Sequence, residues 1–388
     1  VIGVQGAFST SAGKTEIYDG TFETVACDKH LNGSSAFYAL YVAGESGEVV
    51  CNVHGGTFKS ISKVAAFIGN SNDGGDKLDA VANFYGGTFI TGDNNNVIHV
   101  DEKLGGLEIS GGQYLMKDGS KKGDVSQWLA SGMLQEEDGT VIVNPNNAAQ
   151  VGDKYYELLS DAIEKAETGE TIVLLKNVTE DITVNKNIII DGQNQFTISG
   201  ITKLQNGTLR NLTLTNEAGK EILTIGSTDE NTIKMDGVTV KYPVSDPKTT
   251  VTHVLNGNNA YITITGCTFM NEAKNNGVTE GAPEWSYGLY MNDQGTGSFT
   301  FTKSRFEGAF RTMLPNINGT VNITNNEFVN SIYSNNSGST SGSGEEATCI
   351  TTANTDGNVF NITGNTFDNA GAFYFQKTEG STVTGNTF

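Results

Sequence analysis

Arg311 and a group of aromatic residues near it in the sequence carry the side chains best suited to hold a ligand. The guanidinium group of Arg311 is planar and always charged, so it can fix the orientation of a bound group through paired hydrogen bonds. Tyr and Trp rings offer flat apolar faces with polar edges, which suits stacking on sugar rings. We therefore predict a glycan-binding surface formed by Arg311, Tyr290, Tyr374, Trp285, Tyr287, Glu284 and Asn256.

Acid–base catalysis on a polysaccharide is the alternative chemistry for this surface. A lyase would need a carboxylate cluster that binds calcium and a basic side chain that removes a proton. Arg311 could be that base, and Glu284, Glu345 and Glu346 lie in the segments on either side of it. The neighbouring outward positions supply Tyr, Ile and Asn rather than Asp. We therefore predict a non-catalytic protein and keep a polysaccharide lyase or glycosidase, acting on an acidic plant or host glycan, as the alternative.

One tetrapeptide, Asn354-Thr-Asp-Gly357, resembles the first motif of the β-helical polygalacturonases. Members of that family also carry a later paired Asp, a Gly-His-Gly segment and a basic tripeptide. None of these follows here, and the last histidine of the chain is His253. A lone tetrapeptide does not predict a hydrolase.

Metal and cysteine chemistry have little support in the sequence. The acidic segment from Asp73 to Asp79 could bind Ca²⁺ but lacks the spacing of a calcium loop, and such segments usually form solvated turns. The cysteines have no metal-like spacing, and we interpret them as buried thiols, with a Cys27–Cys51 disulfide left open. We predict neither a metal nor a cofactor. The full set is Cys27, Cys51, Cys267 and Cys349.

The elements that would position the predicted surface are repeats of one short pattern. Apolar residues alternate with Thr or Asn, a Gly or polar bend follows, and a Phe returns to the interior, which is typical of a strand with one buried face. Successive repeat Phe residues are 37, 22, 39 and 21 positions apart, which is too far for hairpins and suits turns of a parallel coil. The C-terminal copies occupy residues 262–269, 299–306, 321–328, 360–367 and 381–388.

Stacking of these coils predicts two columns of side chains inside the protein. The repeat Phe residues should form one interior column, made of Phe269, Phe306, Phe328 and Phe367. The bend positions include Asn326, Asn365 and Asn386, whose amides can hydrogen-bond along the stack as an asparagine ladder.

Each coil also holds a second strand, and alternation along it predicts which residues face outward. The inward set is Leu289, Phe310, Cys349 and Phe373, and the outward set is Tyr290, Arg311, Ile350 and Tyr374. Two long insertions, 270–286 and 329–347, flank a coil that has almost no loop. Because coils stack about 4.8 Å apart, the insertions would border a groove on the order of 10 Å wide around Arg311.

The chain divides into two parts built in the same way. Residues 1–143 repeat the pattern with bends such as Val53-His-Gly-Gly-Thr-Phe58, and they end in a cap in which Trp128 and Leu129 are expected to pack. Residues 144–153 are predicted to be a linker. A capping helix at about 156–167 then opens a second domain, residues 154–388.

Two segments resemble known families. The helix followed by "GETIVLLKNVTEDITVNKNIIIDG" is similar to the entry of right-handed parallel β-helices of the pectin-lyase-like superfamily. The segment "ISGGQY…GDVSQWLASGMLQEEDGTVIV" resembles the tail of Gly-Gly-Thr-Phe repeat domains in large cell-surface proteins of gut Gram-positive bacteria. The resemblance implies two tandem right-handed β-helices in an adhesin-like or stalk module. It also implies an extracellular location, with cell-wall attachment through regions outside this chain.

Composition narrows the range of partners. A net charge of −20 argues against binding to nucleic acid, because phosphate recognition needs clustered cations. No apolar run in the sequence is long enough to span a bilayer, so no membrane insertion is expected. We expect a glycan or another host or cell-surface ligand as the partner, and the oligomeric state stays open.

Overall fold

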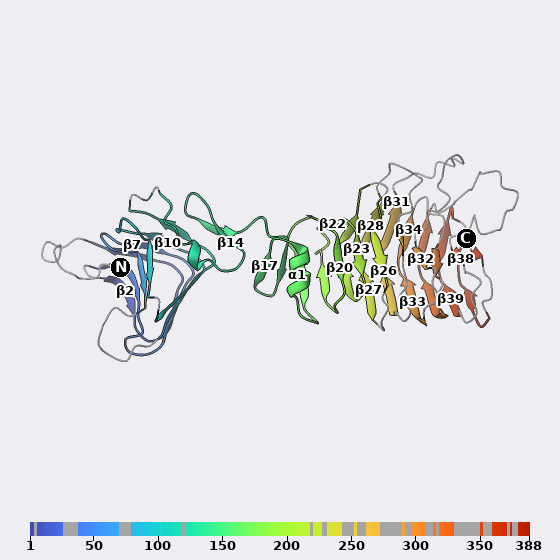
Figure 1. Cartoon of the computed structure of the whole chain (residues 1–388), viewed down its shortest axis with the longest axis horizontal. Helices are drawn as coiled ribbons and strands as arrows, with labels where there is room; N and C mark the ends of the chain where they lie inside the picture. Colours follow the sequence, from blue (N-terminus) through green and yellow to red (C-terminus); the bar gives the residue numbers. More distant parts are fainter. Residues whose placement is uncertain are drawn as a thin grey trace. The chain divides into compact units, whose positions relative to one another are not determined.

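The chain forms an all-β protein in which most strands are parallel and lie in stacked sheets, as the prediction from the repeats required (Figure 1). In each main sheet a strand pairs with the strand that comes three elements later in the sequence. The chain therefore visits one sheet after another and returns to each of them once per coil. This arrangement is consistent with a parallel β-helix.

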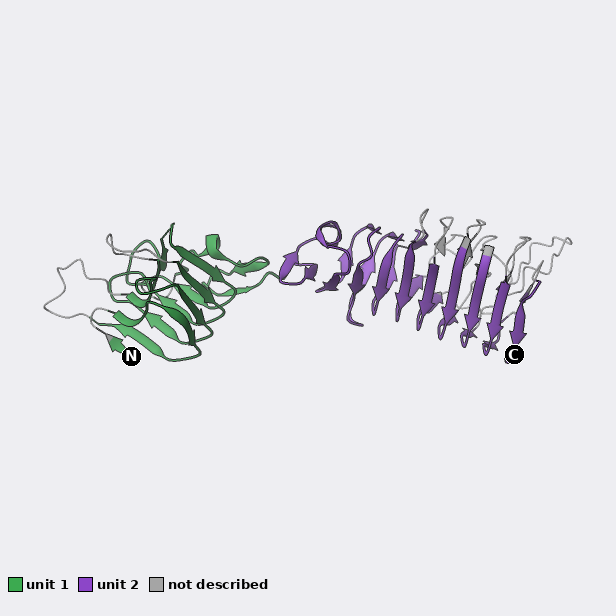
Figure 2. Cartoon of the chain, turned by 90° about the horizontal axis from the view of Figure 1, so that it is seen from below, with its two compact units in different colours: residues 1–146 green, residues 147–388 purple. Residues whose placement is uncertain are grey.

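The computed structural model describes residues 1–3, 6–25, 38–69, 79–101, 103–117, 119, 121–217, 220–226, 231–242, 252–253, 261–271, 289–291, 296–307, 313–315, 318–329, 350–351, 359–370, 373–374 and 379–388. It separates into two compact units, Val1–Asn146 and Asn147–Phe388 (Figure 2). In these ranges no helix is long and apolar enough to cross a membrane.

Unit 1 (Val1–Asn146) contains three parallel sheets followed by a cap. The first sheet consists of β1 (Ile2–Gly3), β4 (Thr21–Thr24), β7 (Thr57–Lys59), β10 (Thr88–Ile90) and β13 (Gln113–Leu115). The second consists of β2 (Gly6–Thr10), β5 (Tyr38–Val42), β8 (Ala66–Ile68) and β11 (Ile98–Val100). The third consists of β3 (Gly13–Ile17), β6 (Val49–Val53), β9 (Ala80–Phe84) and β12 (Gly105–Ile109). The cap holds the 3₁₀ helix η1 (Ser126–Trp128) and the antiparallel pair β14 (Met133–Gln135) and β15 (Val141–Val143).

The cap of unit 1 packs as the sequence predicted. Trp128 and Leu129 are partly buried against the hydrophobic core of the unit. Gln135 is buried and its side-chain amide nitrogen donates hydrogen bonds to the carbonyl groups of Gly123 and Gly139. The cap therefore covers the last coil with both apolar and polar contacts.

Unit 2 (Asn147–Phe388) begins with β16 (Ala149–Val151), β17 (Lys154–Tyr156) and the helix α1 (Leu159–Lys165). Strand β16 pairs antiparallel with both β17 and β18, so part of the predicted linker 144–153 is a strand of this unit. The long sheet continues in parallel through β18 (Thr171–Leu174), β21 (Ile189–Asp191), β24 (Gly207–Arg210), β27 (Thr232–Asp236), β30 (Tyr261–Thr265), β33 (Thr296–Thr302), β36 (Asn318–Thr324), β39 (Val359–Thr363) and β42 (Thr382–Thr384).

The described residues of unit 2 form three further sheets. One contains β19 (Val178–Thr179), β22 (Thr197–Ser199), β25 (Thr213–Thr215), β28 (Thr239–Tyr242), β31 (Thr268–Asn271), β34 (Arg305–Glu307), β37 (Glu327–Val329) and β40 (Thr366–Asp368). The other two contain β20 (Ile182–Val184), β23 (Thr202–Leu204), β26 (Leu223–Ile225) and β29 (Thr252–His253), and then β32 (Leu289–Met291), β35 (Met313–Pro315), β38 (Ile350–Thr351) and β41 (Phe373–Tyr374).

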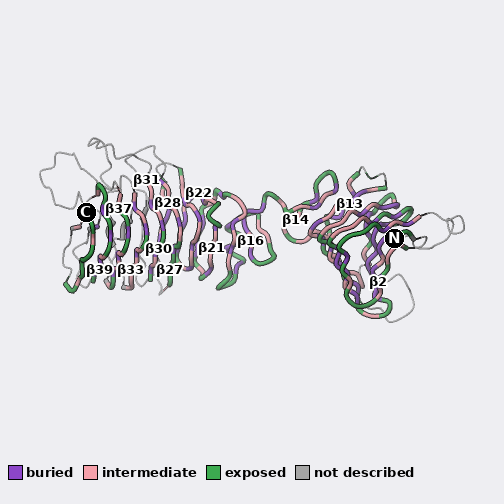
Figure 3. The backbone as a smooth tube through the Cα atoms, turned by 180° about the vertical axis from the view of Figure 1, so that it is seen from behind, coloured by how far each residue is buried: buried purple, intermediate pink, exposed green. Residues whose placement is uncertain are grey.

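Side chains alternate between the core and the surface along these strands, as in Thr232–Asp236 of β27 (Figure 3). Phe269, Phe306, Phe328 and Phe367 lie side by side in register, and each is buried. The predicted interior column is confirmed.

The asparagine ladder is confirmed as well. Asn326 donates its Nδ2 hydrogen to Oδ1 of Asn365, and Asn365 donates in the same way to Asn386, at 3.0 and 2.9 Å. The backbone N–H of each donor residue binds the same oxygen as its amide. The buried Ser304 continues the row, because its backbone N–H donates to Oδ1 of Asn326.

The paired glycines of unit 1 have a steric cause. A Cβ atom on the first glycine of a pair would overlap the backbone carbonyl of the coil below, as Gly86 would overlap the carbonyl oxygen of His54. The second glycine, such as Gly87 at φ +99°, lies in the left-handed region that other residues avoid. In the first coil Asp19 stands in place of the first glycine. A side chain is tolerated there because β3 is the outermost strand of its sheet, so that no preceding coil of this sheet lies below it.

Candidate functional site

The surface predicted around Arg311 falls mostly outside the described residues. Arg311 and four other members of the predicted set have no described placement. Tyr290 and Tyr374 are described only as backbone, within β32 and β41. The four others are Asn256, Glu284, Trp285 and Tyr287.

The register of the second strands corrects part of this prediction. The strand of the coil that holds Arg311 is β35, and its Leu314, rather than Arg311, pairs with Tyr290. Ile350, predicted to face outward, is buried and pairs with Phe373, so Thr351 pairs with Tyr374. Insertions of different length precede these strands, so the count from the previous Phe does not fix which residue enters the sheet.

The other motifs are resolved only in part. The polygalacturonase-like tetrapeptide lies outside the described residues, and so does the acidic segment except for Asp79. Cys27 and Cys349 lie outside them as well. Cys51 and Cys267 are buried free thiols, so Cys51 forms no disulfide with Cys27. Burial raises the pKa of both thiols to about 12. In the described parts of the chain, no group of three or more His, Cys, Asp or Glu side chains could hold a metal ion.

A different surface, on the third sheet of unit 1, gathers exposed aromatic rings. The residue that follows the strand in each of the first three coils is Tyr18, His54 or Tyr85, and we call these three residues the ring row. The His54 ring stacks on Tyr18 with centroids 4.7 Å apart and on Tyr85 at 5.1 Å. Tyr18 is 70% exposed and Tyr85 is 50% exposed. The row therefore presents ring edges, hydroxyl groups and two outer ring faces to solvent.

The ring row differs from the aromatic column that supports the fold of the same unit. Phe22, Phe58, Phe89 and Tyr114 also stack from coil to coil, with centroid distances of 4.8–5.1 Å, but all four are buried. Burial of apolar area is the main contribution of such a column to stability. The ring row keeps much of its area in water, so stability alone does not explain it.

A second set of side chains lies beside the ring row on the same sheet. Glu16, Asn52, Asn83 and Glu108 occupy matching positions of β3, β6, β9 and β12, and we call them the polar row. Asn83 donates from Nδ2 to Oδ1 of Asn52 at 2.9 Å, and Asn52 donates from Nδ2 to Oε1 of Glu16 at 3.0 Å. These bonds connect three side chains, of which Asn52 is buried, Asn83 is half-buried and Glu16 is exposed.

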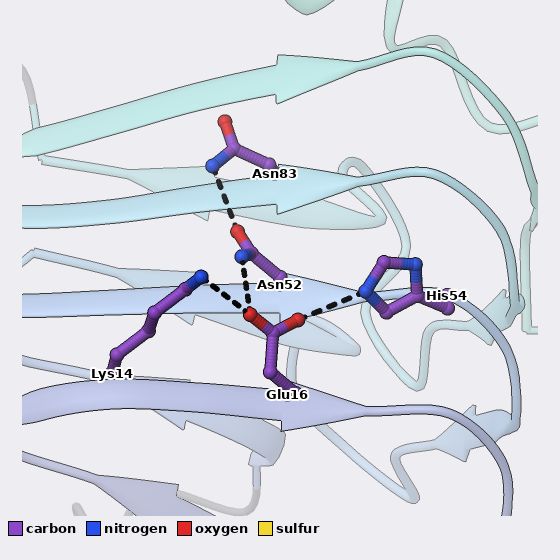
Figure 4. Close-up of polar contacts among 5 residues, drawn as sticks. All are labelled: Lys14, Glu16, Asn52, His54 and Asn83. Carbon is purple, nitrogen blue, oxygen red and sulfur yellow. Dashed lines mark hydrogen bonds and ion pairs between the residues drawn. The ribbon is translucent and has the colours of Figure 1, made fainter.

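Glu16 is the anchor of the polar row (Figure 4). Lys14 and His54 reach its carboxylate from opposite sides, with Lys14 Nζ 2.8 Å from Oε1 and His54 Nε2 2.9 Å from Oε2. A carboxylate only accepts hydrogen bonds, so His54 donates from Nε2. The bonds from Lys14, then His54, then Asn52 lower the pKa of Glu16 from 4.5 to about 2. His54 therefore belongs to the ring row by stacking and is held by the polar row.

The second sheet of unit 1 carries another group of rings, which is more enclosed. Tyr38, Tyr41, Phe67 and His99 contact one another with centroids 5.0–5.7 Å apart. Phe67 is only 6% exposed, and the Tyr41 hydroxyl donates to Glu45 at 2.9 Å. Burial raises the pKa of Tyr38. The rings of this group mainly contact one another and leave less ring surface for a ligand. The ring row is therefore the stronger candidate for a binding site.

The polar row is not arranged for hydrolysis of a glycosidic bond. Its two carboxylates, Glu16 and Glu108, are separated by three strand spacings, or about 14 Å. Retaining and inverting glycosidases place their carboxylates about 5 to 9.5 Å apart. In addition, Glu16 is ionised above pH of about 2 and cannot serve as a general acid near neutral pH. The arrangement suits binding.

Sequence reasoning missed the ring row, although the repeats contain the signal. Tyr18, His54 and Tyr85 stand at the same place in three successive copies of the pattern, just before the bend, and Ser110 takes that place in the fourth. Aligning the copies by their bends would have shown a column of rings. The apolar positions of the repeats, which predict the fold, do not include the residue between the last apolar position and the bend.

Comparisons with protein-family models, with curated proteins and with solved structures found no significant match for this chain.

Proposed function

We propose that this protein is a non-catalytic carbohydrate-binding module whose ligand lies on the third sheet of unit 1, across the ring row and the polar row. The observation that carries the proposal is a row of exposed, stacked rings next to a row of hydrogen-bonded polar side chains. Sugar-binding surfaces combine these two features, because ring faces contact C–H groups and fixed polar groups bind hydroxyls.

Fixed side chains support a binding role because they reduce the entropy lost when a ligand is bound. Asn52, Asn83 and His54 already hold one conformation through their bonds to each other and to Glu16. A ligand on this surface does not have to order them, so more of its contact energy appears as affinity. The surface is open rather than enclosed, so we expect weak binding at a single site and higher avidity when several copies of the protein are displayed together.

The fold type and the cellular setting of the protein belong to the same proposal. We assign both units to right-handed parallel β-helices of the pectin-lyase-like type, because crossovers between parallel strands are right-handed in nearly all proteins. The Gly-Gly-Thr-Phe repeats support a bacterial, secreted or cell-surface setting, in which the chain serves as an adhesin-like or stalk module. The groove predicted around Arg311 in unit 2 stays a prediction, as does the alternative of a polysaccharide lyase or glycosidase acting there.

A glycan array probed with the whole chain, followed by calorimetry with the best oligosaccharide, tests the proposed function. The double substitution Tyr18→Ala and Tyr85→Ala should weaken binding by about 5- to 150-fold, since two lost ring contacts amount to about 1–3 kcal/mol. The matched control is Tyr261→Ala, because Tyr261 is 48% exposed and lies in unit 2. Equal affinity of the double variant and the control would contradict the proposal, and so would release of a cleaved product from the bound glycan.

A further inference from the structure

The hydrogen bonds of the polar row all donate toward Glu16, and the Glu16 carboxylate sets this direction. Because the Glu16 carboxylate can only accept hydrogen bonds, Asn52 must turn its Nδ2 toward it and its Oδ1 toward the next coil. Asn83 must then turn its Nδ2 toward Asn52. The Oδ1 atom of Asn83 is therefore directed away from Asn52 (Figure 4) and can accept a hydrogen bond at the end of the row that holds Glu108.

The far end of the polar row places two hydrogen-bond acceptors, Asn83 Oδ1 and the Glu108 carboxylate, next to each other. Glu108 pairs in register with Asn83, is exposed, and forms no ion pair with any described residue. The ammonium group of Lys14 contacts Glu16 at the opposite end of the row, and so does the His54 ring. A ligand group placed between Asn83 and Glu108 meets a carbonyl oxygen and a full negative charge.

The same end of the surface holds one of the two outer ring faces of the ring row, that of Tyr85. Tyr85 stacks on His54 through one face, and its neighbour on the other side, in the next coil, is Ser110. A serine side chain is too small to cover a phenol ring, which agrees with the 50% exposure of Tyr85. A cation near Asn83 and Glu108 would thus lie close to an open aromatic face, which attracts positive charge.

We infer that this end of the site, formed by Tyr85, Asn83 and Glu108, selects a sugar unit that carries a protonated amino group. The inference rests on the proposed function and specifies its ligand class. An ammonium group donates three hydrogen bonds and carries a positive charge, so it satisfies the carbonyl, the carboxylate and the ring face together. An N-acetylated sugar lacks the charge, and a uronic acid would be repelled by Glu108.

The test compares three tetrasaccharide probes on the whole chain at pH 6 and low salt: one of β-1,4-linked glucosamine, one of N-acetylglucosamine and one of galacturonic acid. We expect the glucosamine tetramer to bind at least tenfold more tightly than its acetylated counterpart and the acidic tetramer not to bind. Glu108→Gln should abolish the preference for the amine. Glu137→Gln removes an equally exposed carboxylate from the cap of unit 1 and should preserve the preference.

The outcomes separate the inference from the proposed function. Failure of the glucosamine tetramer to bind overturns the inference, and so does an equal effect of Glu108→Gln and Glu137→Gln, which would mean general attraction to an acidic protein. The proposed function is decided separately, by whether the Tyr18 and Tyr85 substitutions remove binding to the best array glycan. If the unmodified chain binds the best array glycan through Tyr18 and Tyr85 but binds the glucosamine tetramer no better than its acetylated counterpart, the proposed function stands and the inference is overturned.

Discussion

Glu16 shows how one carboxylate can organise a surface. Its bonds to Lys14, His54 and Asn52 favour the ionised form, and the low pKa reports that preference. A carboxyl group whose pKa is lower in the folded state stabilises that state above its ordinary pKa, here 4.5, and this stabilisation is lost as the pH falls toward about 2. The site should therefore keep its geometry throughout the mildly acidic range.

Replacing Lys14 by Met tests this account of Glu16. The Lys14 ammonium makes the largest contribution to the low pKa of Glu16, so its removal should move that pKa upward toward 4.5. An NMR titration of the Glu16 carboxyl carbon measures the shift. Lys59→Met, which removes a similar ion pair with Glu23 on another sheet, should leave the pKa of Glu16 unchanged. An unchanged titration in Lys14→Met would mean that His54 and Asn52 suffice.

The asparagine ladder predicts a large difference between two asparagines of the same coil. Asn365→Ala removes the acceptor for both the backbone N–H and the Nδ2 group of buried Asn326, and it also removes the donor to the carbonyl of Ile323. Unpaired buried groups cost about 1–3 kcal/mol each, so we expect the free energy of unfolding of unit 2 to fall by about 3 kcal/mol.

Asn361→Ala is the control for the ladder. Asn361 lies on the outer face of β39, where its Nδ2 donates to Asn322. We expect a loss below about 1 kcal/mol, because solvent can replace this bond. Equilibrium unfolding in urea measures the free energy of unfolding of both variants. Equal losses would contradict a stabilising role for the buried ladder.

The helix α1 is stabilised at both ends by side chains from other elements. Its N-cap residue, Leu158, offers no side-chain hydrogen bond. Instead Glu180 accepts bonds from the backbone N–H groups of Leu159 and Ser160, at 2.9 and 3.0 Å. At the other end Lys186 donates to the carbonyl groups of Ile163 and Ala166. A carboxylate at the N-terminus and an ammonium at the C-terminus also complement the helix dipole.

Glu180→Ala should therefore loosen α1 without unfolding the sheets. Loss of a helix cap costs about 0.5–2 kcal/mol, and we expect hydrogen exchange at Ala162 and Ile163 to accelerate correspondingly. The matched control is Glu164→Ala, which removes an exposed ion pair with Lys165 and should change little. Equal protection of α1 in the two variants would contradict a capping role for Glu180.

The strands differ in how well the sequence predicts their register. The Phe column and the asparagine ladder were predictable because both lie within one copy of the repeat, where spacing is constant. The second strands follow insertions of variable length, so Leu314 and Ile350 could not be placed by counting. The ring row was missed for another reason. Tyr18, His54 and Tyr85 acquire a role only when three coils are compared.

At the scale of the molecule, the two units have separate hydrophobic cores. The core of unit 1 runs from Ile17 to Val141, the core of unit 2 from Ala148 to Phe367, and the two share no residue. Each unit also has a capping element of its own, η1 with β14 and β15 in unit 1 and α1 in unit 2. Separate cores imply that each unit can unfold without the other.

Fragments cut between Asn146 and Asn147 should each fold, and the whole chain should show two melting transitions. Calorimetry of the chain and of both fragments measures this directly. We expect each transition of the whole chain to coincide with that of one fragment. Failure of the 147–388 fragment to fold would contradict the division at this point.

Binding of carbohydrate to the ring row of unit 1 can be measured ring by ring in a single titration. Aromatic ¹³C–¹H NMR spectra of the whole chain, recorded with increasing amounts of the best array glycan, report on each ring separately. We predict that the signals of Tyr18, His54 and Tyr85 shift together with one dissociation constant, while that of Tyr261 stays in place. Shifts confined to rings of unit 2, with the ring row unchanged at saturation, would contradict the claim.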